Sequence, residues 1–401
     1  MIDLNLLKEE DRLVISRINE KGRAWIVGGW VRDSLSGLIP TELDLATTLT
    51  PRDVQAIFPR SIMTGEKFGT TIVRIDDSEK ASYQCEVTTL RADGGYGDGR
   101  RPDNVVFGQE IEDDLARRDF TINAMAVDDS GRLIDPFGGL DDLQEGLLRT
   151  VGSAEERISE DGLRILRAFR FMGPEGGDIR KMDVALMTAI SSNLRMLESV
   201  SKERIWAELG KILSGKNTLE IVESMKESGV LEVILGGIEA NTDVVFSSNK
   251  LVNLALICSN EQLNPSELST ILSKNLRLSN KEAGTVSFLH VLREIEIDHS
   301  LESVRRFCAV NDTNVRIDIL DYLSGIGRDL TKFQESLVSI SSTGFENQCL
   351  IDGNSLSEIT GLNPGRRLGR LKDWLHTIQI QRGITSREEV ISSLEEIDWK
   401  E

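Results

Sequence analysis

Residues 24–48, AWIVGGWVRDSLSGLIPTELDLATT, contain the pattern on which the fold prediction rests. An apolar run stops at Gly28-Gly29, a short amphipathic stretch with Arg32 follows, and a second apolar-alternating run begins after Pro40. This order predicts a strand, a glycine turn, a helix, a turn and a second strand.

Glu42 and Asp44 lie two positions apart in the second of these strands. Side chains two apart on an extended strand point the same way, roughly 7 Å apart along the chain, so the two carboxylates should stand side by side. Next to glycine N–H groups and Arg32, such a pair suits a nucleoside triphosphate with its Mg²⁺ ions, because oxygen ligands hold Mg²⁺ and the glycines let phosphates approach. The alternative is a surface turn followed by an edge strand with two solvated acids.

Composition indicates an ordinary globular protein. The 401 residues are 39% hydrophobic and 28% charged, with a formal net charge of −19, and this length predicts two to four domains. No long apolar span or signal-like start is evident, and four scattered cysteines without CxxC spacing suggest reduced thiols, so we expect a cytoplasmic protein away from membranes. So acidic a chain can bind nucleic acid only if its arginines gather on one face.

The two halves of the chain differ in their secondary-structure pattern. Six of the eight prolines occur up to Pro174, and helical periodicity dominates after it. We therefore predict an α+β fold, in which a small mixed β-sheet ends near residue 145 and an elongated all-α region follows. The strand candidates are residues 24–27, 42–46, 70–75, 83–90 and 104–107.

Two further segments carry candidate site residues. In YQCEVTTLR (83–91), Glu86 lies where a neighbouring strand would add a third carboxylate to the metal site; an exposed strand glutamate is the alternative. In LARRDFTINAMA (115–126), arginines can pair with phosphates, while Asp and Asn can hydrogen-bond a ribose hydroxyl. The residues concerned are Arg117, Arg118, Asp119 and Asn123, and a helix start with surface charges is the alternative.

The block SEDGLRILRAFRFMG (159–173) predicts a helix with Ser159 as N-cap and Glu160 in its first turn. A row of charged residues recurs every third position along it: Asp161, Arg164, Arg167 and Arg170. Asp161 and Arg164 together offer an acceptor beside a donor fork, which matches the amino donor and ring-nitrogen acceptor of cytosine and adenine and opposes guanine and uracil. The alternative is an i,i+3 ion pair on a solvated helix face.

Several of these motifs together resemble one family, the bacterial-type (class II) tRNA nucleotidyltransferases and poly(A) polymerases. The resemblance covers residues 20–210 and 350–390, through GGWVRD, ELDLAT, TPRDVQAIFP, an RRDxxxN block and an EDxxR block. It implies a nucleotidyltransferase head over 1–145, a helical neck over 146–213, a helical body over 214–310 and a tRNA-binding tail over 311–401. The blocks 135–149 and 201–209 would then couple head and helices, although capping and packing explain them nearly as well.

The resemblance also implies a role for each site residue. Glu42, Asp44 and Glu86 would be catalytic, with Glu42 and Asp44 as the metal ligands; the family usually has Asp at the position of Glu42, so the metal geometry is altered while two oxygen donors remain. The implied nucleotide-binding residues are Gly28, Gly29, Arg32, Arg118, Asp119, Asn123, Asp161, Arg164, Arg167 and Arg170. Arg366, Arg367 and Arg370, with Lys372, form a basic cluster that would clamp the tRNA acceptor arm or be a solvated helix face.

The implied activity is CCA addition to the 3′ acceptor end of tRNA from CTP and ATP, with Mg²⁺ as cofactor and no obligate protein partner. A glycine-rich loop (92–107) with Tyr96, Arg100 and Arg101 resembles the mobile loop of complete CCA-adding enzymes, or is a disordered hairpin tip. The segment TGEKFGTTIV (64–73) resembles the form found in CCA-adding enzymes, and this resemblance favours CCA addition over a poly(A) polymerase. Addition of the terminal A alone, or tRNA binding without catalysis, are the remaining alternatives.

Overall fold

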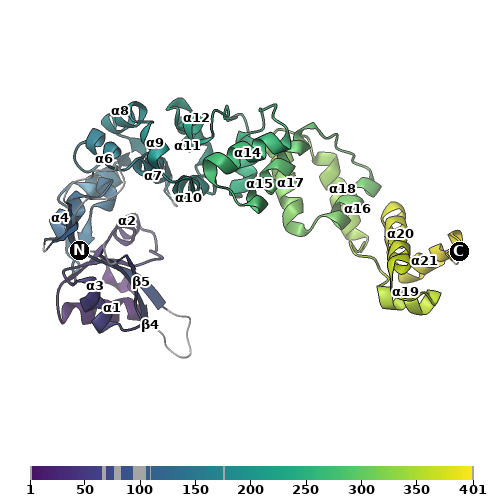
Figure 1. Cartoon of the computed structure of the whole chain (residues 1–401), viewed down its shortest axis with the longest axis horizontal. Helices are drawn as coiled ribbons and strands as arrows, with labels where there is room; N and C mark the ends of the chain where they lie inside the picture. Colours follow the sequence, from purple (N-terminus) through teal and green to yellow (C-terminus); the bar gives the residue numbers. More distant parts are fainter. Residues whose placement is uncertain are drawn as a thin grey trace. The chain divides into compact units, whose positions relative to one another are not determined.

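The computed structural model describes residues 2–65, 69–75, 83–93, 105–108, 110–174 and 177–399, and Figure 1 shows the chain with many of its helices and some of its strands labelled. The chain divides into two compact units. The first comprises residues 1–238 with 274–277, and the second residues 239–273 with 278–401. The boundaries of head, neck, body and tail given above stay a prediction.

The head is built on the mixed sheet that the sequence predicts. In the described residues seven strands form it, in the order β3-β4-β5-β2-β1-β8-β9. Neighbouring strands are antiparallel except β2 and β5, which run parallel. Their bounds are β1 Ala24–Val27, β2 Asp44–Thr47, β3 Ile62–Gly65, β4 Thr70–Ile75, β5 Tyr83–Thr89, β8 Ala126–Val127 and β9 Leu133–Ile134, and a separate pair joins β6 Arg91–Asp93 to β7 Val105–Phe107.

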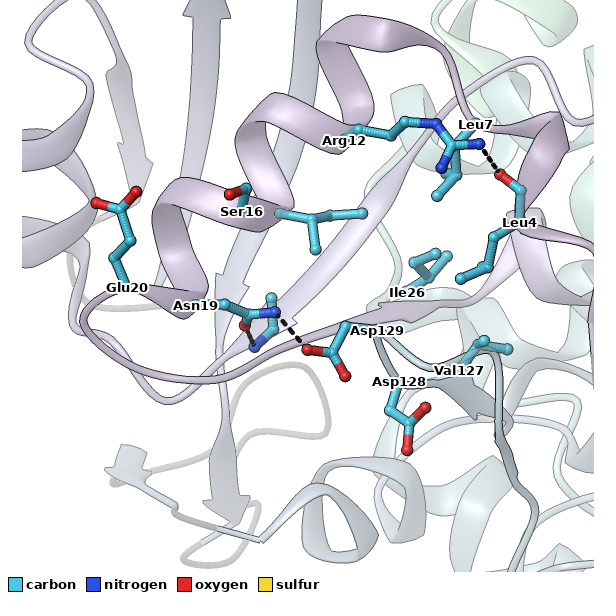
Figure 2. A pocket seen from close by; sticks show the side chains of 12 residues that line it. Leu4, Leu7, Arg12, Ser16, Asn19, Glu20, Ile26, Val127, Asp128 and Asp129 are labelled. Carbon is cyan, nitrogen blue, oxygen red and sulfur yellow. Dashed lines mark hydrogen bonds between the residues drawn. The ribbon is translucent and has the colours of Figure 1, made fainter.

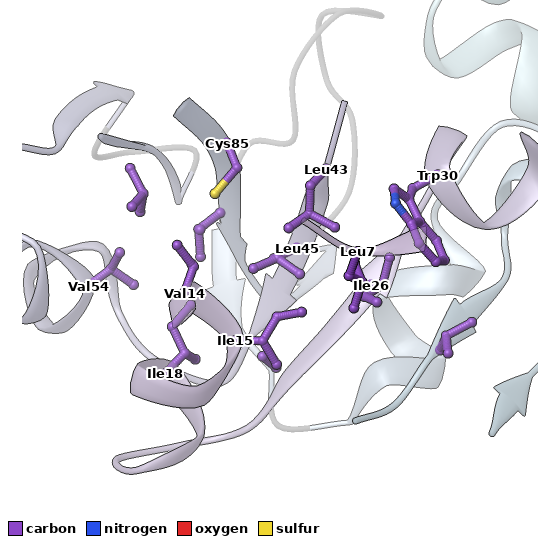
Figure 3. Close-up of a cluster of buried hydrophobic side chains, with 14 of the residues drawn as sticks. Leu7, Val14, Ile15, Ile18, Ile26, Trp30, Leu43, Leu45, Val54 and Cys85 are labelled. Atoms are coloured by element: carbon purple, nitrogen blue, oxygen red, sulfur yellow. The ribbon is translucent and has the colours of Figure 1, made fainter. Parts of the chain in front are cut away.

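Alternation along the strands gives the sheet two apolar faces. Ile26 and Leu45 point to one face, where they pack with helices α1 (Glu9–Asn19) and α3 (Pro51–Ile57) in the cluster of Figure 3. Trp25 and Ala46 point to the other face and pack in a second cluster with Ile111 and Leu115 of α4 (Ile111–Ala116). Asp44, one residue before Leu45, belongs to this second face.

The glycine turn is confirmed. β1 ends at Val27, Gly28 has φ +69°, and α2 (Gly29–Leu35) begins directly after it. A left-handed φ of this kind favours glycine because other residues place their Cβ against the backbone. The second strand begins at Asp44, two residues later than predicted, since Val27 pairs with Asp44 and β1 has no extended residue beyond Val27 to pair with Glu42.

The chain after the sheet is largely helical, as predicted. In the first unit the elements are α5 Gly139–Gln144, β10 Leu147–Leu148, α6 Ala154–Glu160, α7 Leu163–Met172, β11 Lys181–Met182, α8 Val184–Ser192, α9 Met196–Ser199, α10 Lys202–Leu213, α11 Thr218–Glu227 and α12 Val230–Ile234. From α13 onward they are α13 Lys250–Ile257, α14 Pro265–Leu276, α15 Asn280–Val291, α16 Leu301–Val310, α17 Thr313–Gly325, α18 Thr331–Ser342, α19 Gly353–Thr360, α20 Arg366–Arg382 and α21 Arg387–Ser392.

The predicted helix start at Ser159 is wrong. Ser159 and Glu160 are the last residues of α6, and α7 begins only at Leu163. Asp161, between the two helices, has φ −150° and ψ 109° and accepts a hydrogen bond from the Leu163 N–H at 2.9 Å. The capping role therefore falls to Asp161, because the N–H groups in need of an acceptor are those of the second helix.

Two general expectations can be compared with the structure. All four cysteines are free, and Cys85, Cys258 and Cys308 are buried. In the ranges that the structure describes, every helix is too short or too polar to cross a lipid bilayer.

Candidate active site

Strand register brings two of the three predicted catalytic carboxylates together. Asp44 on β2 pairs directly with Glu86 on the parallel strand β5, so both side chains leave the same face of the sheet. Asp44 is half-buried, whereas Glu42, at the bend before β2, and Glu86 are exposed. The prediction that a neighbouring strand places Glu86 beside Asp44 is therefore borne out by the register.

Electrostatics couple these three acids. Burial, the neighbouring Glu86 carboxylate and, to a smaller degree, Glu42 raise the pKa of Asp44 from 3.8 to about 6, while Arg118 and Arg32 oppose the rise. Burial and like charge both disfavour ionisation, so a cation at this point would be bound favourably.

The donor set suits a hard divalent cation, because it consists of carboxylate oxygens alone. Over the described residues, however, no three side chains of the metal-binding types converge closely enough to enclose an ion. The structure thus supplies the Asp44–Glu86 pair with Glu42 at its margin, and the assignment of a metal to it stays a prediction.

The glycine turn lies against this carboxylate pair. A Cβ on Gly28 would lie 3.3 Å from Nη1 of Arg118 and 3.5 Å from Oδ2 of Asp44. A Cβ on Gly29 would lie 3.7 Å from Nη2 of Arg32. Glycine therefore keeps open a space bounded by two guanidinium groups and one carboxylate, and the binding of a triphosphate there stays a prediction.

Both arginines of the 115–126 block pair with Asp114 of α4, and Arg118 also reaches the glycine turn. Arg117 turns to Asp114 of α4, with Nη2 at 2.6 Å from Oδ1. Arg118 donates from Nη1 to the Asn123 carbonyl at 3.2 Å, and its Nε is buried without a hydrogen-bond partner. Of the two arginines, Arg118 is thus the one beside the glycine turn.

Asp119 and Asn123 form the middle of a polar network. Asn123 accepts from Nη1 of Arg32 at 2.8 Å and donates to Asp119 at 3.2 Å, while Asp119 pairs with Arg167 at 2.6 Å. Although burial opposes ionisation, the Arg167 guanidinium holds the pKa of Asp119 below 3.8. The network joins α2, the turn Thr121–Asn123 and α7, so the predicted ribose and phosphate ligands come together.

Asp161 and Arg164 do not form the i,i+3 ion pair considered as an alternative. Oδ2 of Asp161 accepts from Nη2 of Arg204 on α10 at 2.8 Å. Arg164, only 9% exposed, pairs with Glu160 and donates from Nη2 to the Arg117 carbonyl at 3.2 Å. Separate partners therefore hold each of the two residues.

Sequence reasoning missed several residues of this region. Arg204 and Glu208 lie on α10, in the block assigned only to coupling, and Glu208 pairs with Arg170 at 3.1 Å. Phe171 lies among three guanidinium groups and meets Phe120 edge-on at 5.7 Å. The i,i+4 spacing of Arg204 and Glu208 could have indicated a helix face, but nothing local indicates which partner that face meets.

The remaining predicted residues belong to the basic cluster on α20 and to the glycine-rich loop. Arg366, Arg367 and Arg370 are exposed on α20 in the second unit, and Arg367 donates to the Trp399 carbonyl at 2.8 Å. The loop residues Tyr96, Arg100 and Arg101 lie outside the described residues, as do residues 66–68 of the 64–73 segment.

A cavity of about 440 Å³ in the head is lined by none of the predicted site residues (Figure 2). It lies beside α1 and Ile26, where Nδ2 of Asn19 donates to Asp129 at 3.2 Å. Ile26 points to the α1 face of the sheet, so this cavity and the carboxylates are on opposite faces.

Comparison with known proteins supports the class that the fold and site define, a nucleotidyltransferase with a helical extension. Residues 24–149 match the family described as poly A polymerase head domain, and residues 181–241 match the probable RNA and SrmB-binding site of polymerase A. In the solved CCA-adding enzyme of Bacillus stearothermophilus in complex with CTP, the same fold recurs with a TM-score of 0.73 at 24% identity, covering 97% of this chain and 98% of that one.

Sequence relatives give the family. A CCA-adding enzyme of Streptococcus gordonii is 31% identical over 371 residues, 89% of each chain. A CCA-adding enzyme of Geobacillus thermodenitrificans is 42% identical over 224 residues, a match that spans 56% of this chain and only 54% of that relative. The chain belongs to the family of CCA-adding enzymes.

Proposed function

We propose that this protein is a CCA tRNA nucleotidyltransferase, which adds C, C and A to the 3′ end of tRNA from CTP and ATP without a nucleic-acid template. The 3′ hydroxyl oxygen forms a bond to the α-phosphorus of the nucleotide, the bond from that phosphorus to the bridging oxygen breaks, and pyrophosphate leaves. We place the reaction in the cytoplasm.

The observation that supports this proposal most is the pairing of Asp44 with Glu86 beside Gly28 and Arg118. Glu42 and Asp44 would hold Mg²⁺, which when bound neutralises phosphate oxygens. Glu86 is exposed on the adjacent strand, where it can accept the proton of the attacking hydroxyl. The hydroxyl loses that proton as the new ester bond forms.

The other site residues orient the nucleotide. Gly28 and Gly29 let the triphosphate approach the backbone, and Arg32 with Arg118 offers guanidinium donors to its oxygens. We assign hydrogen bonds to the ribose to Asp119 and Asn123. The network geometry and the motifs that the chain shares with its family support this division.

Base choice is assigned to Asp161 and Arg164, with Arg167 and Arg170 lining the pocket. Because Arg204 and Glu160 hold the two base-recognition residues separately, the acceptor and the donor keep a fixed spacing. A carboxylate accepts more than two hydrogen bonds, so Asp161 retains capacity for a base amino group. The guanidinium of Arg164 then donates to the adjacent ring nitrogen.

The tRNA would contact exposed arginines of α20. CCA-adding enzymes have been solved with tRNA, as in the Thermotoga maritima enzyme complexed with tRNA, which shares this fold at a TM-score of 0.66 and 20% identity, covering 99% of this chain and 98% of that one. Positive charge gathered in an acidic chain favours phosphate contacts there.

The decisive experiment incubates the purified chain with Mg²⁺, CTP, ATP and a tRNA that ends at its discriminator base. Addition of two C and one A is the expected result. A long A tail would instead identify a poly(A) polymerase, extension only of tRNA ending in CC an A-adding enzyme, and binding without incorporation a non-catalytic relative. Asp44→Ala is the matched control: it should bind tRNA and incorporate nothing.

A further inference from the structure

Arg180 is a buried cation that the sequence motifs did not indicate. Its side chain is only 7% exposed, and it follows α7 by eight residues. Nη1 donates to the Phe171 carbonyl at 2.8 Å, and the backbone N–H donates to the Met172 carbonyl at 2.8 Å. These contacts fix the guanidinium at the C-terminal end of α7.

The charge of Arg180 is not neutralised by a carboxylate. Within the ranges that the structure describes, no Asp or Glu oxygen lies within ion-pair distance of this guanidinium. Burial, reinforced by the charge of Arg32, lowers the pKa of Arg180 to about 10, and Asp33 compensates only in part. A buried charge without an opposite charge beside it is costly, so an anion from outside the chain would stabilise the Arg180 guanidinium.

The neighbouring arginines differ from Arg180 in this respect. Arg32, Arg167 and Arg170 lie 5.2, 5.1 and 4.3 Å from the centre of the Phe171 ring. Each of these three is paired with an acid: Arg32 with Asp33, Arg167 with Asp119, and Arg170 with Glu208. Arg180, bound to the carbonyl of the same Phe171, is therefore the cation left over in this group.

We propose that Arg180 is a phosphate-binding residue, which together with Arg32 binds the polyphosphate tail of the incoming nucleotide and the pyrophosphate that leaves. The inference rests on the proposed function of the site, because Arg32 is there assigned to the triphosphate. A guanidinium fork matches the geometry of phosphate oxygens, and the Phe171 carbonyl engages only one of its nitrogens. The ring of Phe171 keeps the arginine side chains spread around it.

The test is binding of inorganic pyrophosphate to the full chain, measured by calorimetry without tRNA and with a chelator present. Arg180→Gln should weaken this binding about tenfold, the loss expected for one charge-assisted hydrogen bond. Arg180→Lys keeps the charge but not the guanidinium fork, so its pyrophosphate affinity should lie between those of the natural protein and Arg180→Gln. Arg195→Gln removes an equal charge from an exposed side chain directly before α9 and should leave pyrophosphate affinity unchanged.

Two further measurements separate the proposed role of Arg180 from a folding defect and from a contact with the phosphates of tRNA. Arg180→Met replaces an unpaired buried charge by an apolar chain, so it should fold, melt no lower than the natural protein and lose pyrophosphate binding to the same degree. Arg180→Gln should also raise KM for CTP and ATP by one common factor, because both share the tail. Unchanged pyrophosphate affinity in Arg180→Gln, or a loss confined to tRNA binding, would overturn the inference. Pyrophosphate binding needs no turnover, so a failure of CCA addition would be seen separately.

Discussion

The ion-free fold disfavours the charged form of Asp44, and this residue is also central to the proposed chemistry. Its pKa, raised by burial and by Glu86 to about 6, lies above the value of 3.8 for a free side chain. The folded state therefore binds a proton more tightly than the unfolded state, and folding stability falls as the pH rises from 3.8 to 6. This loss is what a bound cation would recover.

Asp44→Asn should therefore be more stable than the natural protein in metal-free buffer at pH 7.5, by on the order of 2 kcal/mol, while losing all incorporation. The gain should vanish at pH 4, where Asp44 is protonated in the folded chain. Urea denaturation at both pH values, with chelator present, measures it. An equal gain in stability of Asp44→Asn at pH 4 and pH 7.5 would show that the charge of Asp44 does not destabilise the fold.

Arg204 is bound at 2.8 Å to Asp161, the proposed base-recognition residue, so we expect Arg204 to affect base choice. Arg204→Ala should free the Asp161 carboxylate and lower the preference for CTP over UTP about tenfold, the cost of one charge-assisted hydrogen bond. Ratios of kcat/KM for the two nucleotides measure the effect. Lys211→Ala, an exposed change on the same helix, is the control, and full rejection of UTP by a folded Arg204→Ala protein would remove Arg204 from this role.

Residue-scale prediction succeeded where one strand sets the geometry. The face on which Asp44 lies follows from alternation along a strand, and Gly28 follows from the stop of an apolar run. Glu42 does not lie on that strand as predicted, because β2 begins only at Asp44. Residue-scale prediction also failed for Arg204 and Phe171, whose importance depends on contacts between elements distant in sequence. Arg180 has no local pattern at all, since its role arises from what surrounds it.

At the scale of elements, the junction between α6 and α7 positions Asp161. A Cβ added to Gly162 would collide with the Met196 carbonyl, so the junction packs directly on the backbone of the adjoining segment. The sequence pattern suggested one continuous helix here because Ser159 and the acids after it resemble a cap. Only the close approach of residue 196 shows why the chain bends after Glu160.

Gly162→Ala should therefore lower stability by about 2–4 kcal/mol, because a backbone collision cannot relax by a side-chain rotation. Gly284→Ala is the matched change: it lies exposed in α15 with open space around it, so it should raise stability by about 0.5–1 kcal/mol. Thermal melts of both variants measure the difference in sign. Stability changes of the same sign in both variants would contradict the close packing of Gly162 against the backbone of residue 196.

For the whole molecule, the net charge of −19 makes the exposed cluster Arg366, Arg367 and Arg370 unusual. Replacing all three by Gln should weaken tRNA binding and lower the salt slope of log Kd by about one for each lost phosphate contact. Filter binding from 50 to 200 mM salt measures the slope. Gln at Lys281, Lys332 and Arg387, also exposed in the second unit, removes the same charge. Equal losses of tRNA affinity in both triple variants would indicate a general electrostatic attraction of tRNA instead of binding to a defined surface.

The order of a mixed sheet followed by helices was predictable, because prolines and alternating apolar residues concentrate in the first part and helical periodicity follows. The strand order was not, since the parallel pairing of β2 with β5 depends on long-range contacts that spacing does not encode. The packing of the helices after the sheet could not be predicted either, because the apolar face of an amphipathic helix does not show which other element it packs against.

Crystals of the protein soaked with Mn²⁺ and a non-hydrolysable CTP analogue test the site most directly, because anomalous scattering locates the ion without assumption. We expect an anomalous peak within bonding distance of the Asp44 and Glu42 carboxylates, with the analogue phosphates on its other side. An ordered nucleotide with no ion at these carboxylates would contradict the proposed catalysis.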